Sequence, residues 1–338
     1  MTRPVAAGSG PVDNPANAPL SGDPRRGVGR RAVCAWLAAL SALPSLACGG
    51  ETPPPTVDLE DLVVTFVGSI PGPGTDAMAL PTEAQTSRFV EALRAAQAGD
   101  PRRAQELVAP LAYGVRTLAD SVTRRRMYVF EERRTRGGEW PNGWGMYVIA
   151  AESARPLLVE VAHPVHDVNT PQVGVQAFRD GRAAALLVAG THRYANRDGS
   201  SDVAHDDRTM FAEVNRALVR RGQTVLQPHG FDSSGPARES DGIEHSDVVV
   251  SAGTAPPPPV VDAVAAALQR KGFAVCEYDG DRCADLGGTL NVEGEWCREV
   301  GATFVHLELD RDVRDDPTRR ALAARTVVKT LGSVPDAS

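Results

Sequence analysis

Short apolar runs alternate with amphipathic stretches from about residue 126 to the end of the sequence. The runs have strand length, while the stretches between them repeat apolar residues at helical spacing. The pattern predicts strands at 127–130, 145–149, 157–162, 184–189, 224–227, 248–251, 273–277 and 304–309, and helices at 171–180, 208–221 and 259–271. Strands that alternate with helices favour an α/β fold, a doubly wound, mostly parallel sheet with helices on both faces. We assign this domain to residues 126–331.

Two further helices are expected ahead of this domain. Thr82 and Gln85 match a capping box before one apolar stripe, and Asp100 followed by Pro101 is a helix start before another. Residues 81–125 are therefore predicted to form a small helical hairpin. The preceding residues 48–80 are rich in Pro and Gly, which favours an extended tether, with one short strand expected at 62–67.

Residues 1–47 have the pattern of a signal peptide. Arginines at 25, 26, 30 and 31 precede an apolar run that is shorter than the roughly 20 residues of a transmembrane helix. The segment Ser-Leu-Ala-Cys48 resembles the processing site of bacterial lipoproteins, at which Cys48 would receive the lipid. We expect an exported protein that is lipid-anchored to the cell envelope. The alternative is a soluble periplasmic or secreted form, because the small residues before Cys48 also suit an ordinary signal peptidase.

Charge and cysteine usage narrow the classes of partner. The formal net charge is -7, and arginines outnumber aspartates in the first 47 residues, so the remainder is more acidic still. Such a surface does not attract phosphates, and we expect no nucleic-acid partner and no membrane contact except the lipid anchor. With Cys34 removed and Cys48 lipidated, we expect one disulfide among Cys276, Cys283 and Cys297, with one spare thiol.

The histidines gather in one part of the chain and include three at the ends of predicted strands. His163, His192 and His229 each follow an apolar run, and in an open α/β sheet ligands bind at the carboxyl ends of the strands. A lone histidine near a strand end is usually structural, whereas several that converge favour a metal site or catalysis. All seven lie between residues 163 and 306: His163, His166, His192, His205, His229, His245 and His306.

These residues suit a zinc hydrolase, which needs three protein ligands and an open position for water. His163 supplies one ligand and His229 supplies another from a different strand. Asp167 is our choice for the third, with His166 as the substitute. A general base is also required. Glu308 is a lone acid in an apolar strand, where alternation places it on the opposite face from its apolar neighbours.

Several short segments carry a family resemblance: Glu160-Val-Ala-His163, Asp167, Thr170, Gly190-Thr-His-Arg193, Pro228-His229-Gly230 and His306-Leu-Glu308. Together they resemble the poly-gamma-glutamate hydrolases and N-formylglutamate amidohydrolases, relatives of zinc carboxypeptidases. The resemblance spans about residues 157–311 and implies that His163, Asp167 and His229 bind zinc while Glu308 activates water. The sequence departs from the family in two ways. The carboxylate ligand is Asp rather than Glu, and the glycine run after the first histidine is missing.

Other polar residues are candidate substrate contacts. Arg193 is expected to clamp a substrate carboxylate, because guanidinium groups pair bidentately with carboxylates. The alternative is an ordinary salt bridge from Arg193 to Asp198 or Asp202. His192 is expected beside Arg193, and Asn291 is a candidate for holding substrate, although a Gly-rich turn explains it nearly as well.

The sequence thus predicts an exported, zinc-dependent amidohydrolase or carboxypeptidase-like enzyme. It would cleave an amide bond beside a carboxylate in an acyl amino acid, a peptide or a polyglutamate. The alternative is a non-catalytic envelope lipoprotein whose histidines form a structural or metal-binding cluster. A serine hydrolase is disfavoured because the sequence contains no Gly-x-Ser-x-Gly elbow.

Overall fold

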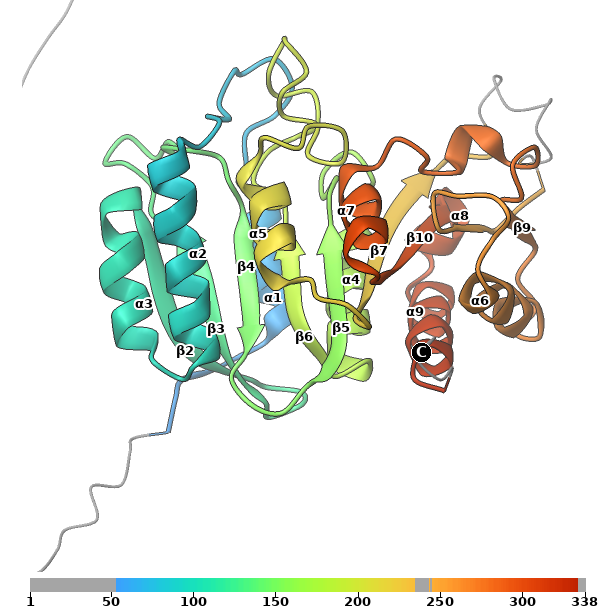
Figure 1. Ribbon diagram of the computed structural model, residues 1–338, viewed down its shortest axis with the longest axis horizontal. Helices are drawn as coiled ribbons and strands as arrows, with labels where there is room; N and C mark the ends of the chain where they lie inside the picture. The colour runs from blue at the N-terminus through green and yellow to red at the C-terminus, as the bar shows by residue number, and fades with distance from the viewer. Residues whose placement is uncertain (1–52, 235–242, 244, 334–338) are drawn as a thin grey trace, which may run out of the picture. The chain divides into compact units, whose positions relative to one another are not determined.

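One mixed sheet organises the part of the chain that the computed structural model describes, residues 53–234, 243 and 245–333 (Figure 1). The predicted signal peptide and Cys48 lie outside these residues. The strand order is β1-β2-β3-β4-β6-β5-β7-β10-β8-β9. The strands are β1 (Thr56–Val57), β2 (Tyr113–Asp120), β3 (Arg126–Glu132), β4 (Met146–Ala150), β5 (Arg155–Val161), β6 (Ala183–Val188), β7 (Thr224–Phe231), β8 (Val248–Ser251), β9 (Val275–Glu277) and β10 (Thr303–Asp310).

The sheet has a parallel centre and a largely antiparallel side. Strands β6, β5, β7 and β10 run parallel to one another. The neighbouring pairs β2–β3, β3–β4 and β4–β6 are antiparallel, and β8 is antiparallel to β10. The expected α/β class is confirmed. The predicted strands near residues 127–130 and 145–149 pair as β3 and β4.

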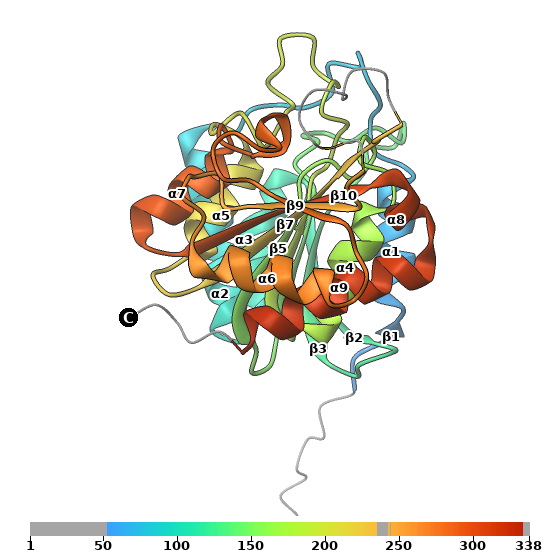
Figure 2. The same ribbon diagram turned by 90° about the vertical axis from the view of Figure 1, so that its right-hand side faces the viewer.

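Helices cover both faces of the sheet, as Figure 2 shows from its end. Alternation along β5 divides the core, because Val159 and Val161 pack into one apolar cluster and Leu158 into the other. The first cluster includes buried residues of α1 (Leu59–Val67), α4 (Thr170–Asp180), α6 (Pro259–Gln269) and α9 (Pro317–Leu331). The second includes buried residues of α2 (Glu83–Gln97), α3 (Pro101–Val108), α5 (Met210–Leu218) and α7 (Val292–Val300).

Residues 62–67, predicted as a strand within a tether, belong to helix α1. The side chain of Asp58 caps this helix by accepting a hydrogen bond from the backbone N–H of Glu60 at 2.8 Å. Leu59, Val63 and Phe66 are buried at helical spacing, so the helix packs into the core although its sequence contains β-branched residues. The tether prediction is therefore wrong for the described residues before 80, which include β1 and α1.

The predicted helical hairpin is present as α2 and α3, with Thr82 and Gln85 forming the capping box and Asp100 capping the second helix. It ends earlier than predicted, because residues 113–120 form strand β2. Phe89 of α2 packs edge-to-face on Tyr113 of β2, with ring centroids 5.0 Å apart. The hairpin therefore shares its core with the sheet.

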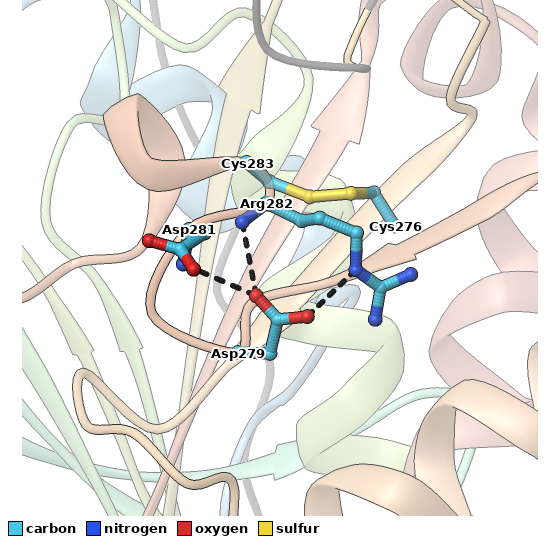
Figure 3. Close-up of a disulfide and its surroundings, with 5 residues drawn as sticks. All are labelled: Cys276, Asp279, Asp281, Arg282 and Cys283. Carbon is cyan, nitrogen blue, oxygen red and sulfur yellow. Dashed lines mark hydrogen bonds and ion pairs between the residues drawn. A yellow bond between two sulfur atoms is a disulfide. The ribbon is translucent and has the colours of Figure 1, made fainter.

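A disulfide closes the loop that follows β9. Cys276 is bonded to Cys283, which confirms the expected disulfide, and Cys297 is a buried free thiol. Within this loop Asp279 accepts hydrogen bonds from the backbone and side chain of Arg282 (Figure 3). The loop leads into the short 3-10 helix η2 (Ala284–Leu286), which brings Asp285 to the site described below.

Among the described residues, no helix has both the length and the apolar character that a membrane span requires.

Candidate metal centre

The carboxyl ends of the central strands carry the residues predicted as ligands. His163 follows β5, and His229 lies near the end of β7. A turn after His163 brings Asp167 back toward it, because the backbone N–H of Asp167 donates to the carbonyl of His163 at 2.9 Å. The hydroxyl of Thr170 in turn donates to the carbonyl of Asp167 and fixes the start of α4.

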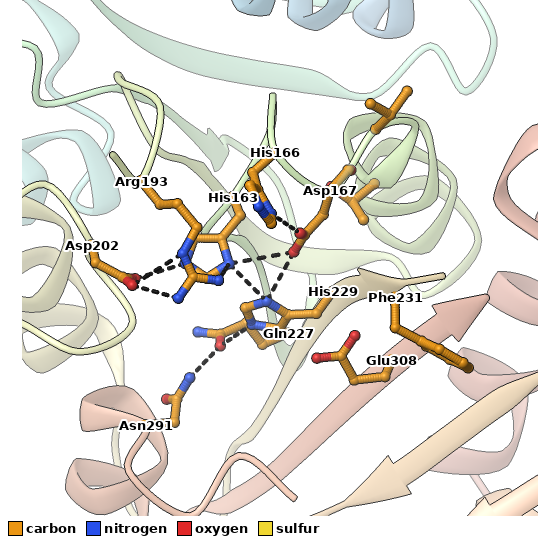
Figure 4. A network of polar contacts seen from close by, with 12 residues as sticks. His163, His166, Asp167, Arg193, Asp202, Gln227, His229, Phe231, Asn291 and Glu308 are labelled. Carbon is orange, nitrogen blue, oxygen red and sulfur yellow. Dashed lines mark hydrogen bonds and ion pairs between the residues drawn. The ribbon is translucent and has the colours of Figure 1, made fainter. Parts of the chain in front are cut away.

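One side-chain atom from each of His163, Asp167 and His229 faces the other two (Figure 4). His163 Nδ1 lies 3.1 Å from His229 Nδ1 and 3.3 Å from Asp167 Oδ2, and His229 Nδ1 lies 3.2 Å from the same carboxylate oxygen. All three side chains are buried. The structure thus brings the three predicted ligands together.

The second nitrogen of each imidazole already has a partner. His163 Nε2 lies 2.8 Å from Asp202 Oδ1, and His229 Nε2 lies 2.7 Å from Gln227 Oε1. An ionised carboxylate only accepts hydrogen bonds, so His163 carries its proton on Nε2 and presents a lone pair at Nδ1. A metal-binding histidine commonly donates its other N–H to such a partner, which orients the ring.

These residues fit a metal ion by donor type and spacing. Tetrahedral zinc binds imidazole nitrogen and carboxylate oxygen at about 2.0–2.2 Å, which separates two ligand atoms by roughly 3.3 Å. The observed separations of 3.1 to 3.3 Å match that spacing. When both rings are neutral and protonated on Nε2, two nitrogen lone pairs and a carboxylate oxygen oppose one another in a buried place, where unsatisfied acceptors are costly. A shared cation removes that cost.

The pKa values in this cluster shift in different directions. Burial alone would lower the pKa of His163, but hydrogen bonds to Asp167 and Asp202 outweigh it and raise this pKa above 6.5. Burial lowers the pKa of His229. Burial would raise the pKa of Asp167, yet its hydrogen bonds to three histidines hold it well below the usual value. Asp167 is therefore ionised, and a proton on His163 would compete with a metal ion for Nδ1.

A cavity of about 320 Å³ opens over this cluster. It combines the three predicted ligands with polar groups from four other segments, so a small polar molecule can reach the place where a metal would sit. Its lining residues are His163, His166, Asp167, Arg193, Tyr194, Ala204, His205, His229, Gly230, Asp285, Leu286, Gly288, Asn291, His306 and Glu308.

Glu308 lies beside the ligands because β7 and β10 run parallel in register. Glu308 of β10 is paired with His229 of β7, so both side chains reach the same edge of the sheet. The carboxylate of Glu308 is largely buried, and its Oε1 lies 3.9 Å from His306 Nε2. The ring of His306 packs over Gly288 so closely that a Cβ there would lie 2.9 Å from the ring, and the positive φ of 63° also favours glycine.

The remaining predicted residues take different places around the cavity. His166 does not replace Asp167 but hydrogen-bonds to its second oxygen at 2.9 Å. Arg193 makes the predicted alternative salt bridge, because its Nη2 and Nε contact Asp202 Oδ2 at 2.5 and 3.1 Å, while its Nη1 lies 3.4 Å from His163 Nδ1. His192 accepts a hydrogen bond from the backbone of Tyr194 and is outside the described cavity lining.

Asn291 lines the cavity, but its side-chain amide is engaged inside the protein. Its Oδ1 accepts from the backbone N–H of Gly294 as the N-cap of α7, and its Nδ2 donates to Gln227 Oε1 at 2.6 Å. Both functional atoms of the amide thus have partners, which disfavours the predicted role in holding substrate.

Sequence reasoning missed several residues behind the ligands. Gln227 contacts His229, and its amide nitrogen donates to the buried carboxylates of Glu160 and Glu293. One signal was available, because Gln227 is a lone amide in an otherwise apolar segment of β7. No comparable signal marked Glu293, which looks like an ordinary acidic residue in the first turn of a helix.

No family model matches this sequence, and no curated protein matches it. Similar solved structures include an N-formylglutamate amidohydrolase from Ralstonia eutropha, 14% identical with a TM-score of 0.36, covering 54% of this chain and 94% of that one. An aspartoacylase family protein from Mesorhizobium loti is 12% identical with a TM-score of 0.37, covering 66% and 67%. A succinylglutamate desuccinylase from Silicibacter is 12% identical with a TM-score of 0.35, covering 65% of each chain. The structural neighbours thus include an N-formylglutamate amidohydrolase, one of the families that the sequence motifs resemble.

Proposed function

We propose that this protein is a zinc-dependent amidohydrolase that cleaves an amide bond beside a carboxylate. The convergence of His163 Nδ1, His229 Nδ1 and Asp167 Oδ2 within 3.1 to 3.3 Å carries the proposal. Two histidines and one carboxylate leave a fourth position of a tetrahedral site open to the cavity, as in catalytic rather than structural zinc sites.

Zinc bound there would polarise the substrate carbonyl and make a water molecule more acidic. The position of Glu308 supports its role as the general base, because it lines the same cavity as the three candidate ligands and is paired with His229 across strands β7 and β10. Its carboxylate accepts a proton from the attacking water and returns a proton to the departing amine nitrogen. Such transfers need a group within hydrogen-bond reach of the reacting atoms, which a side chain lining the cavity satisfies.

Arg193 supports recognition of a carboxylate next to the cleaved bond. Asp202 holds two of its guanidinium nitrogens, which fixes the plane of the group, and Arg193 lines the cavity. A guanidinium has five N–H donors, so one bound carboxylate does not exhaust it. The candidate substrates are therefore acyl amino acids, peptides or polyglutamates that present a carboxylate beside the amide.

We further propose that the protein is exported and that Cys48 carries a lipid. The basic and apolar leader supports export. The disulfide between Cys276 and Cys283 suits an oxidising compartment. Cells that express the chain with Cys48→Ser should lose its incorporation of labelled fatty acid. Fatty-acid labelling that persists in this variant would reject Cys48 as the lipidated residue.

The proposed reaction is tested with the purified chain, N-formylglutamate, N-acetylaspartate and gamma-glutamyl peptides. We expect release of free amino acid from at least one of these, its loss after dialysis against a chelator, and its recovery with zinc. A non-catalytic metal-binding lipoprotein is the rival function. Zinc that binds stoichiometrically without any hydrolysis across this panel would favour the rival.

A further inference from the structure

A chain of hydrogen bonds leads from helix α7 to His229. It begins at a backbone N–H, which can only donate and so sets the orientation of each amide that follows. The N–H of Gly294 donates to Asn291 Oδ1 at 2.9 Å, so the amide oxygen of Asn291 faces the helix. The amide nitrogen of Asn291 must then face Gln227, and it donates to Gln227 Oε1 at 2.6 Å. This contact fixes the amide orientation of Gln227, whose oxygen and nitrogen ends are nearly the same in shape.

The opposite side of Gln227 faces two buried carboxyl groups, which accept from its amide nitrogen. Its Nε2 lies 3.1 Å from Glu160 Oε2 and 3.3 Å from Glu293 Oε2, and Asn215 donates to the other oxygen of Glu160 at 2.7 Å. These residues are all 0 to 1% exposed, so water does not substitute for a lost partner. A reversed Gln227 would place its nitrogen against the amide nitrogen of Asn291.

We propose that Asn291 and Gln227 are positioning residues that select the His229 tautomer able to bind a metal. Gln227 Oε1 can only accept, so the Nε2 of His229, at 2.7 Å, must carry the proton. Nδ1 then presents its lone pair to His163 and Asp167. The inference rests on the metal site of the proposed function, but it concerns a state of the protein that exists before any metal or substrate binds.

The substitution Asn291→Asp reverses this chain of hydrogen bonds with little change in shape. An aspartate still caps α7, because one of its oxygens accepts from the N–H of Gly294. Its second oxygen would oppose Gln227 Oε1, so the Gln227 amide turns its nitrogen toward it and toward His229. His229 Nε2 must then accept, the proton moves to Nδ1, and the metal-binding lone pair is lost.

The matched variant Asn291→Ser separates this effect from simple damage. Serine also caps a helix, but it places no second acceptor against Gln227 and forces no reversal. Thermal unfolding of both variants checks that each is folded. A merely structural role for Asn291 would weaken the site equally in both.

The experiment has two readouts on the full purified chain. Nitrogen-15 NMR of metal-free protein, at a pH where His229 is neutral, should show its proton on Nε2 in the wild type and on Nδ1 in Asn291→Asp. Chelator competition with zinc should show affinity about 10- to 100-fold weaker in Asn291→Asp, as expected for an outer partner of a ligand, and a markedly smaller loss in Asn291→Ser.

A wild-type His229 protonated on Nδ1, or zinc binding by Asn291→Asp as tight as the wild type, would overturn the inference. Equal losses in the two variants would also overturn it. The tautomer is read without metal or turnover, so absence of hydrolysis would reject the proposed function while leaving this inference standing.

Discussion

In the antiparallel half of the sheet, the buried ionised groups find opposite charges or N–H donors within the protein. Arg179 of α4 donates to Asp120 at the end of β2 at 2.7 Å and to Asp58 at 2.8 Å. Glu132 of β3 accepts from the backbone N–H groups of Asn142 and Trp144. Each charge there has a donor or an opposite charge beside it.

The parallel half contains a cluster of a different kind. When both rings are neutral, His163 Nδ1, His229 Nδ1 and Asp167 Oδ2 face one another as acceptors, because the proton of each ring is directed outward to Asp202 or Gln227. Buried acceptors are normally satisfied inside a protein, so a buried group of three that converge is a candidate cation site. The contrast separates a structural ion-pair network from a candidate metal centre.

The largest effect is expected from removing a ligand. His229→Ala should abolish hydrolysis and weaken zinc binding by more than the roughly 100-fold seen when outer partners are lost. Zinc should raise the unfolding temperature of the wild type but not of this variant, because only a folded site that binds the ion is stabilised by it. Calorimetry with and without zinc measures this difference. An equal rise in the unfolding temperatures of the wild type and the variant would show that zinc does not bind at His229, and that the cluster needs no metal, like the antiparallel half.

Glu308→Gln should separate binding from chemistry. The amide cannot accept the proton, so turnover should fall by about 10² to 10⁴-fold while zinc affinity stays near that of the wild type. Steady-state kinetics and zinc titration are measured on the same preparation. Turnover that survives this change would remove Glu308 from the mechanism.

Asp120→Asn should damage the antiparallel half and leave the metal centre intact. Breaking a buried charge pair by removing one partner costs about 3 kcal/mol, and Arg179 would keep only Asp58, whose side chain is 34% exposed. Denaturant unfolding should show that loss of free energy, while the zinc affinity of the folded variant is unchanged. An equal loss of zinc affinity would mean that the two halves are coupled.

The smallest expected effect is on stability: the contributions of Asp120 and His163 to the free energy of unfolding should depend on pH in opposite directions. Hydrogen bonds with Arg179 and Thr123 outweigh burial and lower the pKa of Asp120, so its contribution to stability is present above about pH 4 and is lost as the pH falls further. The pKa of His163 is raised, so its contribution in metal-free protein is present below about pH 6.5 and is lost as the pH rises.

Unfolding free energies of the wild type, Asp120→Asn and His163→Gln, measured without metal from pH 3 to 9, isolate the two contributions. The difference between wild type and His163→Gln should shrink above pH 6.5. A difference that grows there would contradict the assigned partners of His163. Zinc should reverse the trend, because it binds only the deprotonated ring.

The sequence predicted which candidate ligands come together better than it predicted the residues that surround them. Strand ends followed by His163 and His229 indicated one edge of the sheet, because parallel strands bring their carboxyl ends together. Gln227 and Glu293 were not foreseen as partners, since a contact between β7 and the first turn of α7 depends on packing that no local pattern records.

The fold predictions failed where local signals conflicted. Residues 62–67 are rich in β-branched residues, yet they belong to α1, because Asp58 caps this helix and its buried residues recur at helical spacing. The sequence places residues 113–120 in the hairpin because they show no clear alternation, and they form β2 through pairing with β3.

Zinc K-edge X-ray absorption on the zinc-reconstituted protein tests the metal centre most directly. We expect about one zinc per chain, with some four nitrogen or oxygen ligands at roughly 2.0–2.1 Å and multiple scattering from two imidazoles. Loss of all zinc on dialysis into metal-free buffer, or a sulfur shell at about 2.3 Å, would contradict a site made by His163, His229 and Asp167.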